Sequence, residues 1–244
     1  MSEIALYISG IPYKNYFELC KPKVVLLILF TAVVGMLLAT KGAIPLDKLF
    51  FAILGIGLAA ASGAAVNHWV DQRIDAVMER TKNRPLPQAG LSSNGAIIFA
   101  LAMGVAAMLI LITQINAITA LLTLISLIGY AVIYTMYLKR TTPQNIVLGG
   151  AAGAAPPLLG WTAMTGEVNS EALLLFLIIF IWTPPHFWAL AIKRKDEYAK
   201  AGIPMLPVTH GIMFTKVHIL LYTLLLLSVT LMPFVINMSG LFYL

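Results

Sequence analysis

Three oxygen-bearing side chains follow one another at intervals of four residues in the segment NHWVDQRIDAVMERTKNRPLP, residues 67–87. On a helix, each step of four residues turns by only about 40°, so Asn67, Asp71 and Asp75 share one face. No lysine or arginine stands three or four positions from either aspartate. The helix itself therefore supplies no counter-charge, and a cation from elsewhere must neutralise these carboxylates.

An amide and two carboxylates form an all-oxygen set of ligands, which suits a hard ion such as Mg²⁺. Mg²⁺ usually binds one or two carboxylates and completes its shell with water and phosphate oxygens. The same loop continues with Arg80, Lys82 and Arg84, whose charges suit a phosphate group. The spacing therefore predicts a Mg²⁺–diphosphate site. The alternative is a solvated amphipathic loop whose acids pair with residues of other helices.

A second polar loop, KRKDEYAKAGIPMLP at residues 193–207, again mixes bases with acids. Its candidate site residues are Lys193, Arg194, Asp196, Glu197 and Tyr198. By itself this run is typical of a solvated rim beside a membrane. Its expected position opposite the first loop favours a second acidic motif or further neutralisation of phosphate charge.

Two more segments carry polar residues at the ends of apolar stretches. In YTMYLKRTTPQN, residues 134–145, Lys139 and Arg140 either anchor a helix at the membrane surface or stabilise a departing anion. In WTPPHFW, residues 182–188, a proline pair predicts a kinked helix that presents His186 among aromatic rings. That histidine could contact haem or another flat acceptor, act as an acid or base, or bond to a neighbouring helix.

The composition shows which elements must position these residues. Of the 244 residues, 60% are hydrophobic and 11% are charged, against about 25% charged in a typical soluble domain. The chain contains apolar stretches long enough to cross a bilayer as helices, at residues 24–40, 49–66, 95–112, 116–138, 146–165, 171–192 and 213–238. We therefore predict an all-α polytopic transmembrane helix bundle, a single membrane domain over residues 1–244 with seven spans.

The basic residues indicate the orientation of this bundle. All but Lys41 and Lys48 of the 16 lysines and arginines fall on one side of the predicted spans. The positive-inside rule then predicts a cytoplasmic N-terminus and cytoplasmic active-site loops. The first 23 residues have the features of neither a signal peptide nor an organelle-targeting segment, which favours a bacterial plasma (inner) membrane. The net charge of +6 is explained by a basic rim beside anionic lipid, so no nucleic-acid partner is expected.

Together these segments resemble the UbiA-type membrane prenyltransferases and, within them, the branch of protohaem IX farnesyltransferases, or haem O synthases. The Asn–Asp spacing is shared by the whole superfamily. The stretches MERTKNRPLP, TPPHFWALA and AGIPMLPV are more particular to the haem branch. The resemblance covers most of residues 67–208, and ELCKPKVVLLILFTAVVG near the N-terminus fits it too.

The resemblance implies a reaction. Farnesyl diphosphate, held by Mg²⁺ on Asn67, Asp71 and Asp75, would ionise toward an allylic cation and diphosphate, with Lys139 in a catalytic role. The vinyl group of haem B would attack the cation and water would capture the product cation, giving haem O. The residues expected to hold the diphosphate are Arg80, Lys82, Arg84, Arg140, Lys193 and Arg194, and those expected to hold the haem are His186, Trp182 and Trp188.

The resemblance also implies partners, and the chain departs from the family's pattern in two respects. Its second acidic motif, Asp196 and Glu197, is less regular than the spaced aspartate pair of other members, and the chain has fewer spans. Haem A synthase or a terminal oxidase under assembly would use the product. The family has nine spans where this chain has seven, so we expect a chain truncated at its C-terminus.

Three other functions remain as alternatives: a prenyltransferase acting on a quinone precursor or a chlorophyll-type ring, a haem-binding or transport protein without catalysis, and a structural assembly factor. A transporter should carry its binding groups near the middle of the bilayer. Here the polar residues gather at one rim, which favours an enzyme that handles a water-soluble diphosphate.

Overall fold

The protein is all-helical over residues 12–244, the part that the computed structural model describes. Seven helices are long and apolar enough to cross a membrane: α3 (Pro22–Ala39), α4 (Leu46–Val70), α6 with η1 (Ser93–Ile110 and Leu111–Ile115), α7 with η2 and α8 (Ala117–Ile128, Gly129–Leu138 and Lys139–Thr141), α9 (Asn145–Thr165), α10 (Ser170–Lys193) and α13 (Gly211–Val235). Each end lies within four residues of its predicted position, and the predicted all-α bundle is confirmed.

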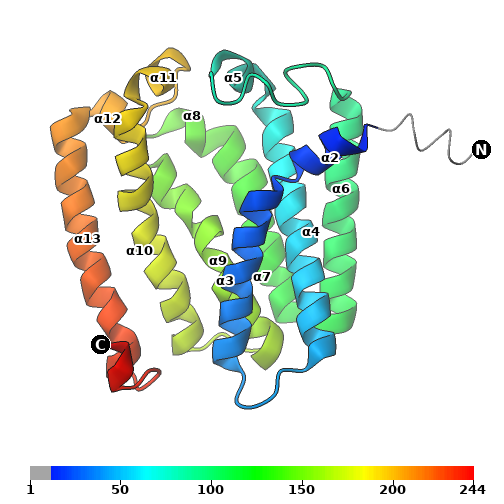
Figure 1. Ribbon diagram of the computed structural model, residues 1–244, viewed down its shortest axis with the longest axis vertical. Coiled ribbons are helices and arrows are strands. Elements are labelled where there is room, and N and C mark those ends of the chain that lie inside the picture. Colours follow the sequence, from blue (N-terminus) through cyan, green and yellow to red (C-terminus); the bar gives the residue numbers. More distant parts are fainter. Residues whose placement is uncertain (1–11) are drawn as a thin grey trace, which may run out of the picture.

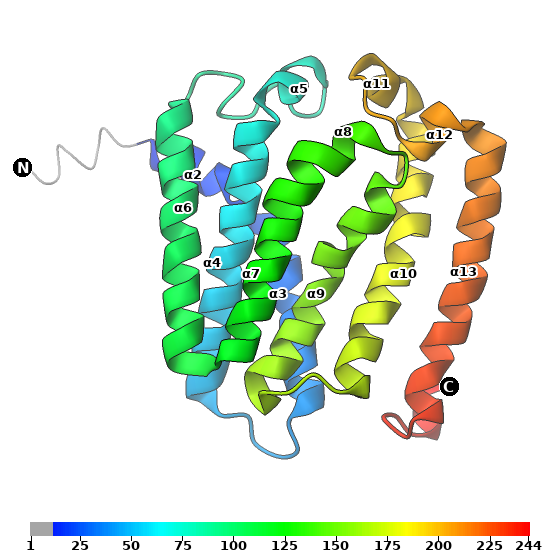
Figure 2. The same ribbon diagram turned by 180° about the vertical axis from the view of Figure 1, so that it is seen from behind.

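The short helices gather at one end of the bundle, which we call the polar end (Figures 1 and 2). They are α2 (Tyr13–Leu19), α5 (Gln72–Val77), α8, α11 (Lys195–Lys200) and α12 (Leu206–Thr209). The chain passes the opposite end at Lys41 and Lys48, and its last helical turn, η3 (Leu241–Tyr243), also lies there. The bundle therefore has the charge asymmetry seen in the sequence. The predicted cytoplasmic N-terminus, residues 1–11, lies outside the described residues.

Small residues bring α3 and α9 into backbone contact near the centre of the bundle. A Cβ atom added at Gly35 would overlap the carbonyl of Pro157, and one added at Gly160 would overlap the carbonyl of Ala32. Close approach through small residues is the usual way in which membrane helices associate. This contact holds α3 against α9, and the start of α3, where α2 joins it, points toward the polar end (Figure 1).

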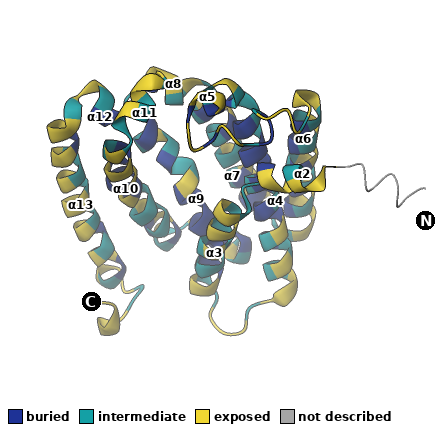
Figure 3. Ribbon diagram, turned by 45° about the horizontal axis from the view of Figure 1, so that its top comes forward, coloured by how far each residue is buried: buried dark blue, intermediate teal, exposed yellow. Residues whose placement is uncertain are grey.

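Helix α10 runs without interruption through the proline pair at 184–185. The two prolines leave the carbonyls of Phe180 and Ile181 without their helical N–H donors, and the Thr183 hydroxyl adds a separate hydrogen bond to the Ile179 carbonyl at 2.7 Å. The proline pair therefore does not end the helix. Helix α13 packs on α10, and most of its remaining surface is exposed and apolar (Figure 3).

Candidate active site

The three residues spaced by four lie where α4 ends and α5 begins. Asp71 separates the two helices, yet its N–H donates to the Asn67 carbonyl at 3.0 Å, and the Asp75 N–H donates to the Asp71 carbonyl at 2.8 Å. The helical spacing therefore continues across the junction. All three side chains are at least 95% buried. The shared face that the spacing predicts is formed, although by two helices rather than one.

Asp71 is neutralised from the end of the fourth span. Its Oδ2 lies 2.5 Å from Lys139 Nζ, and its Oδ1 lies 3.5 Å from Arg140 Nη2. The Asn67 amide also donates to Asp71 Oδ2, at 2.8 Å. The missing counter-charge of the first loop thus comes from α8, about 70 residues further along the chain.

Asp75 and Asn67 are paired with two further cations. Arg84 Nη1 donates to Asp75 Oδ2 at 2.7 Å, and the Thr81 hydroxyl donates to the Asp75 carbonyl at 3.0 Å. Lys21 Nζ donates to Asn67 Oδ1 at 2.5 Å. The loop between α5 and α6 therefore folds back over α5, and the start of α3 closes the site from the other side.

Sequence reasoning did not identify Lys21 as a site residue. Its backbone has a φ of 49° and precedes Pro22, the first residue of α3. Burial, together with the nearby charges of Arg84 and Lys139, lowers the pKa of Lys21 to about 7, against the opposite effect of the two aspartates. In the sequence its only signal is a lysine directly before a proline that opens an apolar span.

The acidic residues fit a Mg²⁺ ion by their donor chemistry. Asp71 Oδ1 is buried and accepts no hydrogen bond from the described chain, so a lone pair is left for a metal. Within residues 12–244, no three residues among His, Cys, Asp and Glu gather as a metal site, so the set is limited to the two aspartates and the Asn67 amide. Such a set leaves room for the phosphate oxygens that usually complete a magnesium shell.

The predicted phosphate-binding residues divide into two groups. Arg84 and Arg140 reach the aspartates as described. Lys82 instead pairs with Glu79 at 2.6 Å on the surface, where both side chains are largely exposed. Arg80 is exposed, and no described residue forms an ion pair with it.

The second polar loop lies across from α5 at the polar end (Figures 1 and 2). Lys193 ends α10, and Arg194 is the residue between α10 and α11. Asp196 is exposed, whereas Glu197 has one carboxylate oxygen that is buried without a hydrogen-bond partner in the described chain. Tyr198 packs on the apolar cluster that joins the end of α5 to α10 and α12. The two loops therefore meet through an apolar contact, with the second acidic motif beside it.

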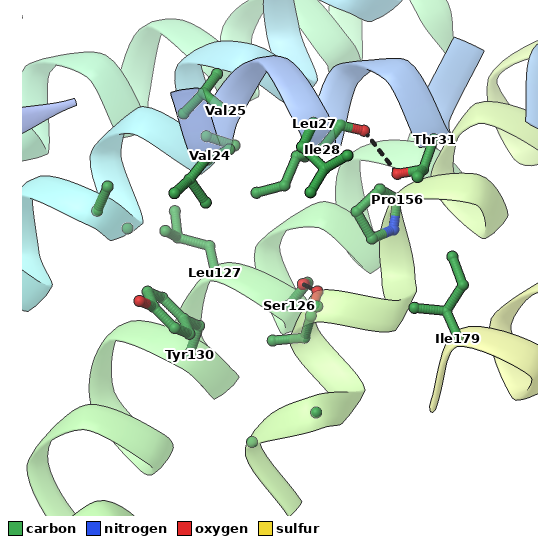
Figure 4. Close-up of a pocket in the computed structure, with 18 of the residues that line it drawn as sticks. Val24, Val25, Leu27, Ile28, Thr31, Ser126, Leu127, Tyr130, Pro156 and Ile179 are labelled. Carbon is green, nitrogen blue, oxygen red and sulfur yellow. Dashed lines mark hydrogen bonds between the residues drawn. The ribbon is translucent and has the colours of Figure 1, made fainter. Parts of the chain in front are cut away.

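A cavity of about 510 Å³ extends from this site into the bundle. Val24 and Ile28 of α3, Tyr130 of η2, Pro156 of α9 and Ile179 of α10 line it (Figure 4). Lys21, which donates to Asn67, belongs to the same lining, so the cavity begins beside the buried polar cluster and continues between largely apolar walls. This arrangement suits a ligand with an anionic head and a long hydrocarbon tail.

The three predicted acceptor residues occupy different places. Trp182 lines the cavity and stacks on His186, with 4.3 Å between ring centroids. His186 is exposed and is not part of the lining. Trp188 is 1% exposed and packs edge-on against Tyr222 and His218 of α13, so it belongs to a helix contact rather than to the cavity.

Comparison with known proteins agrees with this geometry. The profile of the UbiA prenyltransferase family matches residues 28–244. A protoheme IX farnesyltransferase of Thioalkalivibrio sulfidiphilus is 66% identical over 95% of this chain and 77% of its own length. That of Methylococcus capsulatus is 63% identical over 97% of this chain and 79% of its own length.

Two solved structures share the fold. A digeranylgeranylglyceryl phosphate synthase superimposes with a TM-score of 0.80 at 19% identity, over 94% of this chain and 80% of its own. A UbiA homologue from Archaeoglobus fulgidus, bound to DMAPP and Mg²⁺, gives a TM-score of 0.74 at 17% identity, over 93% of this chain and 79% of its own.

Proposed function

This chain belongs to the UbiA prenyltransferase family, and we propose that it transfers a farnesyl group from farnesyl diphosphate to a vinyl group of haem B, giving haem O and diphosphate. The observation that carries the proposal is the placement of buried acid–base pairs at the mouth of a largely apolar cavity. The identity of 59–66% to protoheme IX farnesyltransferases supports the choice of acceptor and donor.

The chain is a multi-pass membrane protein, and we place it in the bacterial inner membrane with its polar end in the cytoplasm. The basic residues of that end support this orientation. Farnesyl diphosphate would then bring its charged head to the rim from the aqueous side and extend its tail between the helices. Haem A synthase or a terminal oxidase under assembly would consume the product.

The cations of the site would stabilise the leaving group. As the bond between the allylic carbon and the diphosphate oxygen breaks, its electron pair leaves with the diphosphate, and the negative charge there grows. Lys139, Arg140 and Arg84 already lie at the aspartates, so they need not be gathered when the reaction starts. Mg²⁺ bound by Asp71 and Asp75 would add positive charge at the same place, as supported by its presence in the Archaeoglobus homologue.

The cavity would control the fate of the cation. Its apolar lining keeps water away from the allylic carbon until the π electrons of the haem vinyl group form the new carbon–carbon bond. Water then adds to the cation left on the former vinyl group, and one proton is released to solvent. One haem B, one farnesyl diphosphate and one water thus give haem O, diphosphate and a proton.

The test is the conversion of haem B to haem O by the purified chain in detergent, with farnesyl diphosphate and Mg²⁺, measured by mass spectrometry. Product should vanish in Asp71→Ala and after EDTA, and it should persist in Asp47→Ala, whose exposed acid lies at the opposite end of the bundle. A chain that prenylates a quinone precursor but leaves haem B unchanged would overturn the proposed acceptor.

A further inference from the structure

A second pocket, of about 420 Å³, opens beside the start of α3. Its polar lining consists of Lys21, Lys23, Arg84, His68 and a single acid, Glu18. Lys23 and Glu18 are exposed, so this pocket faces the surroundings at the polar end. With three basic side chains against one carboxylate, it is suited to an anion.

His68 supplies the buried polar group of this pocket. It is 98% buried, and neither ring nitrogen has a hydrogen-bond partner among residues 12–244. Burying an imidazole N–H without an acceptor costs free energy, and such groups in folded proteins are nearly always satisfied. A carboxylate or phosphate oxygen in the pocket would provide the missing acceptor.

The pocket adjoins the central cavity. Lys21 and Val24 line both, so one ligand can place an anionic edge in the pocket and an apolar body in the cavity. Haem B has this distribution of groups, because its two propionates and its two vinyl groups lie on opposite edges of a flat ring. A ring anchored in the pocket by its propionates would direct its vinyl edge away from them, toward the cavity.

We propose that the second pocket binds the propionate carboxylates of the acceptor, with Lys23 and His68 as the residues that hold them. The proposal rests on the proposed function, since it names the acceptor of that reaction. The propionate edge of the acceptor would then lie on the side of the site formed by α2 and α3. Lys139 and Arg140, at Asp71, are left for the diphosphate.

The experiment compares haem B with its dimethyl ester, in which both propionates are uncharged. Lys23→Gln should raise the KM for haem B about tenfold, the effect of one charged hydrogen bond, and leave kcat and the KM for farnesyl diphosphate unchanged. Glu18→Gln should lower the KM for haem B, because it removes the only negative charge of the pocket. With the ester, neither variant should differ from the parent chain.

His68→Leu and Lys14→Gln complete the series. His68→Leu should raise the KM for haem B but not for the ester. Lys14→Gln removes a positive charge from the exposed surface of α2, outside the pocket, and should have no effect. If Lys23→Gln and His68→Leu change the KM for haem B and for the ester by the same factor, the proposal is wrong.

Lipid composition separates the acceptor from the other source of such an anion. If Lys23→Gln differs from the parent only in phosphatidylglycerol vesicles, and not in phosphatidylcholine vesicles, the occupant is the headgroup of an anionic lipid and the proposal falls. Failure of the proposed function looks different, since the parent chain would then convert neither haem B nor its ester.

Discussion

The ion pair between Asp71 and Lys139 allows the structural and the catalytic contributions of the site to be separated. Asp71 is 1% exposed, and the Lys139 side chain is 16% exposed. Removing one member of such a buried pair leaves the other charge without a partner and costs about 3–5 kcal/mol. Asp71→Asn should fall in this range, because Lys139 then keeps only an amide oxygen.

The reverse change should cost less. In Lys139→Met, Asp71 keeps the Asn67 amide and the Arg140 guanidinium, so the loss should be about 1–3 kcal/mol. The double variant removes both charges, and replacing a whole buried pair is often nearly neutral. It should therefore be more stable than Asp71→Asn alone.

Thermal unfolding in detergent measures these differences. For a chain of this size each kcal/mol shifts Tm by roughly 2–4 °C, so Asp71→Asn should lower Tm by roughly 6–20 °C and the double variant by much less. Haem O formation should fall at least ~100-fold in all three variants, because each removes charge from the proposed diphosphate site. The reasoning fails if the double variant is no more stable than Asp71→Asn, or if Lys139→Met keeps full turnover.

Three further predictions follow from the packing and the charges. Gly35→Ala should lower the free energy of unfolding by about 1–3 kcal/mol, because the added Cβ meets a backbone carbonyl of α9 that cannot move aside. Gly129→Ala, whose added Cβ has nothing within 4 Å, should leave Tm unchanged or raise it, and equal Tm values for the two variants would contradict the close contact. Arg84→Gln should reduce turnover about 100-fold or more, whereas Arg73→Gln, an exposed charge on α5, should not; similar turnover in both would exclude Arg84 from the site. Gly153→Leu should fill space in the cavity and raise the ratio of geranyl to farnesyl diphosphate use in competition, and an unchanged ratio would place the tail elsewhere.

The spans could be predicted from the sequence because the bilayer imposes a length of about 20 apolar residues on each helix. The shared face of Asn67, Asp71 and Asp75 could be predicted for a similar reason, since helical spacing is local. It persists across the break at Asp71 because the backbone hydrogen bonds on both sides keep the same spacing.

The partners of these acids depend on contacts between distant parts of the chain. Lys21 lies 46 residues from Asn67, and the two meet because α3 is fixed against α9 through Gly35 and Gly160. The spacing within a segment holds no information about such a contact. The sequence singles out Lys139 by its charge and its place at the end of a span. It does not predict that Lys139 pairs with Asp71.

The prediction for the aromatic residues of α10 was wrong for Trp188, and helical geometry alone could have corrected it. Trp182 and Trp188 are six positions apart, which turns a helix by about 240°, so they cannot share a face. Trp182 lines the cavity and Trp188 packs toward α13, as that angle requires. Grouping them by residue type rather than by helical position assigned both to the acceptor.

The charges of the site do not balance, and the imbalance indicates what the site is built to receive. Four cations, Lys21, Arg84, Lys139 and Arg140, lie at two carboxylates, Asp71 and Asp75, and the Asn67 amide. The excess of positive charge is one cause of the lowered pKa of Lys21, after its burial. A Mg²⁺ ion on the carboxylates would enlarge that excess, and a prenyl diphosphate, with several negative charges, would offset it. The carboxylates thus hold the cations in place before the substrate arrives, and the substrate supplies the negative charge that the protein lacks.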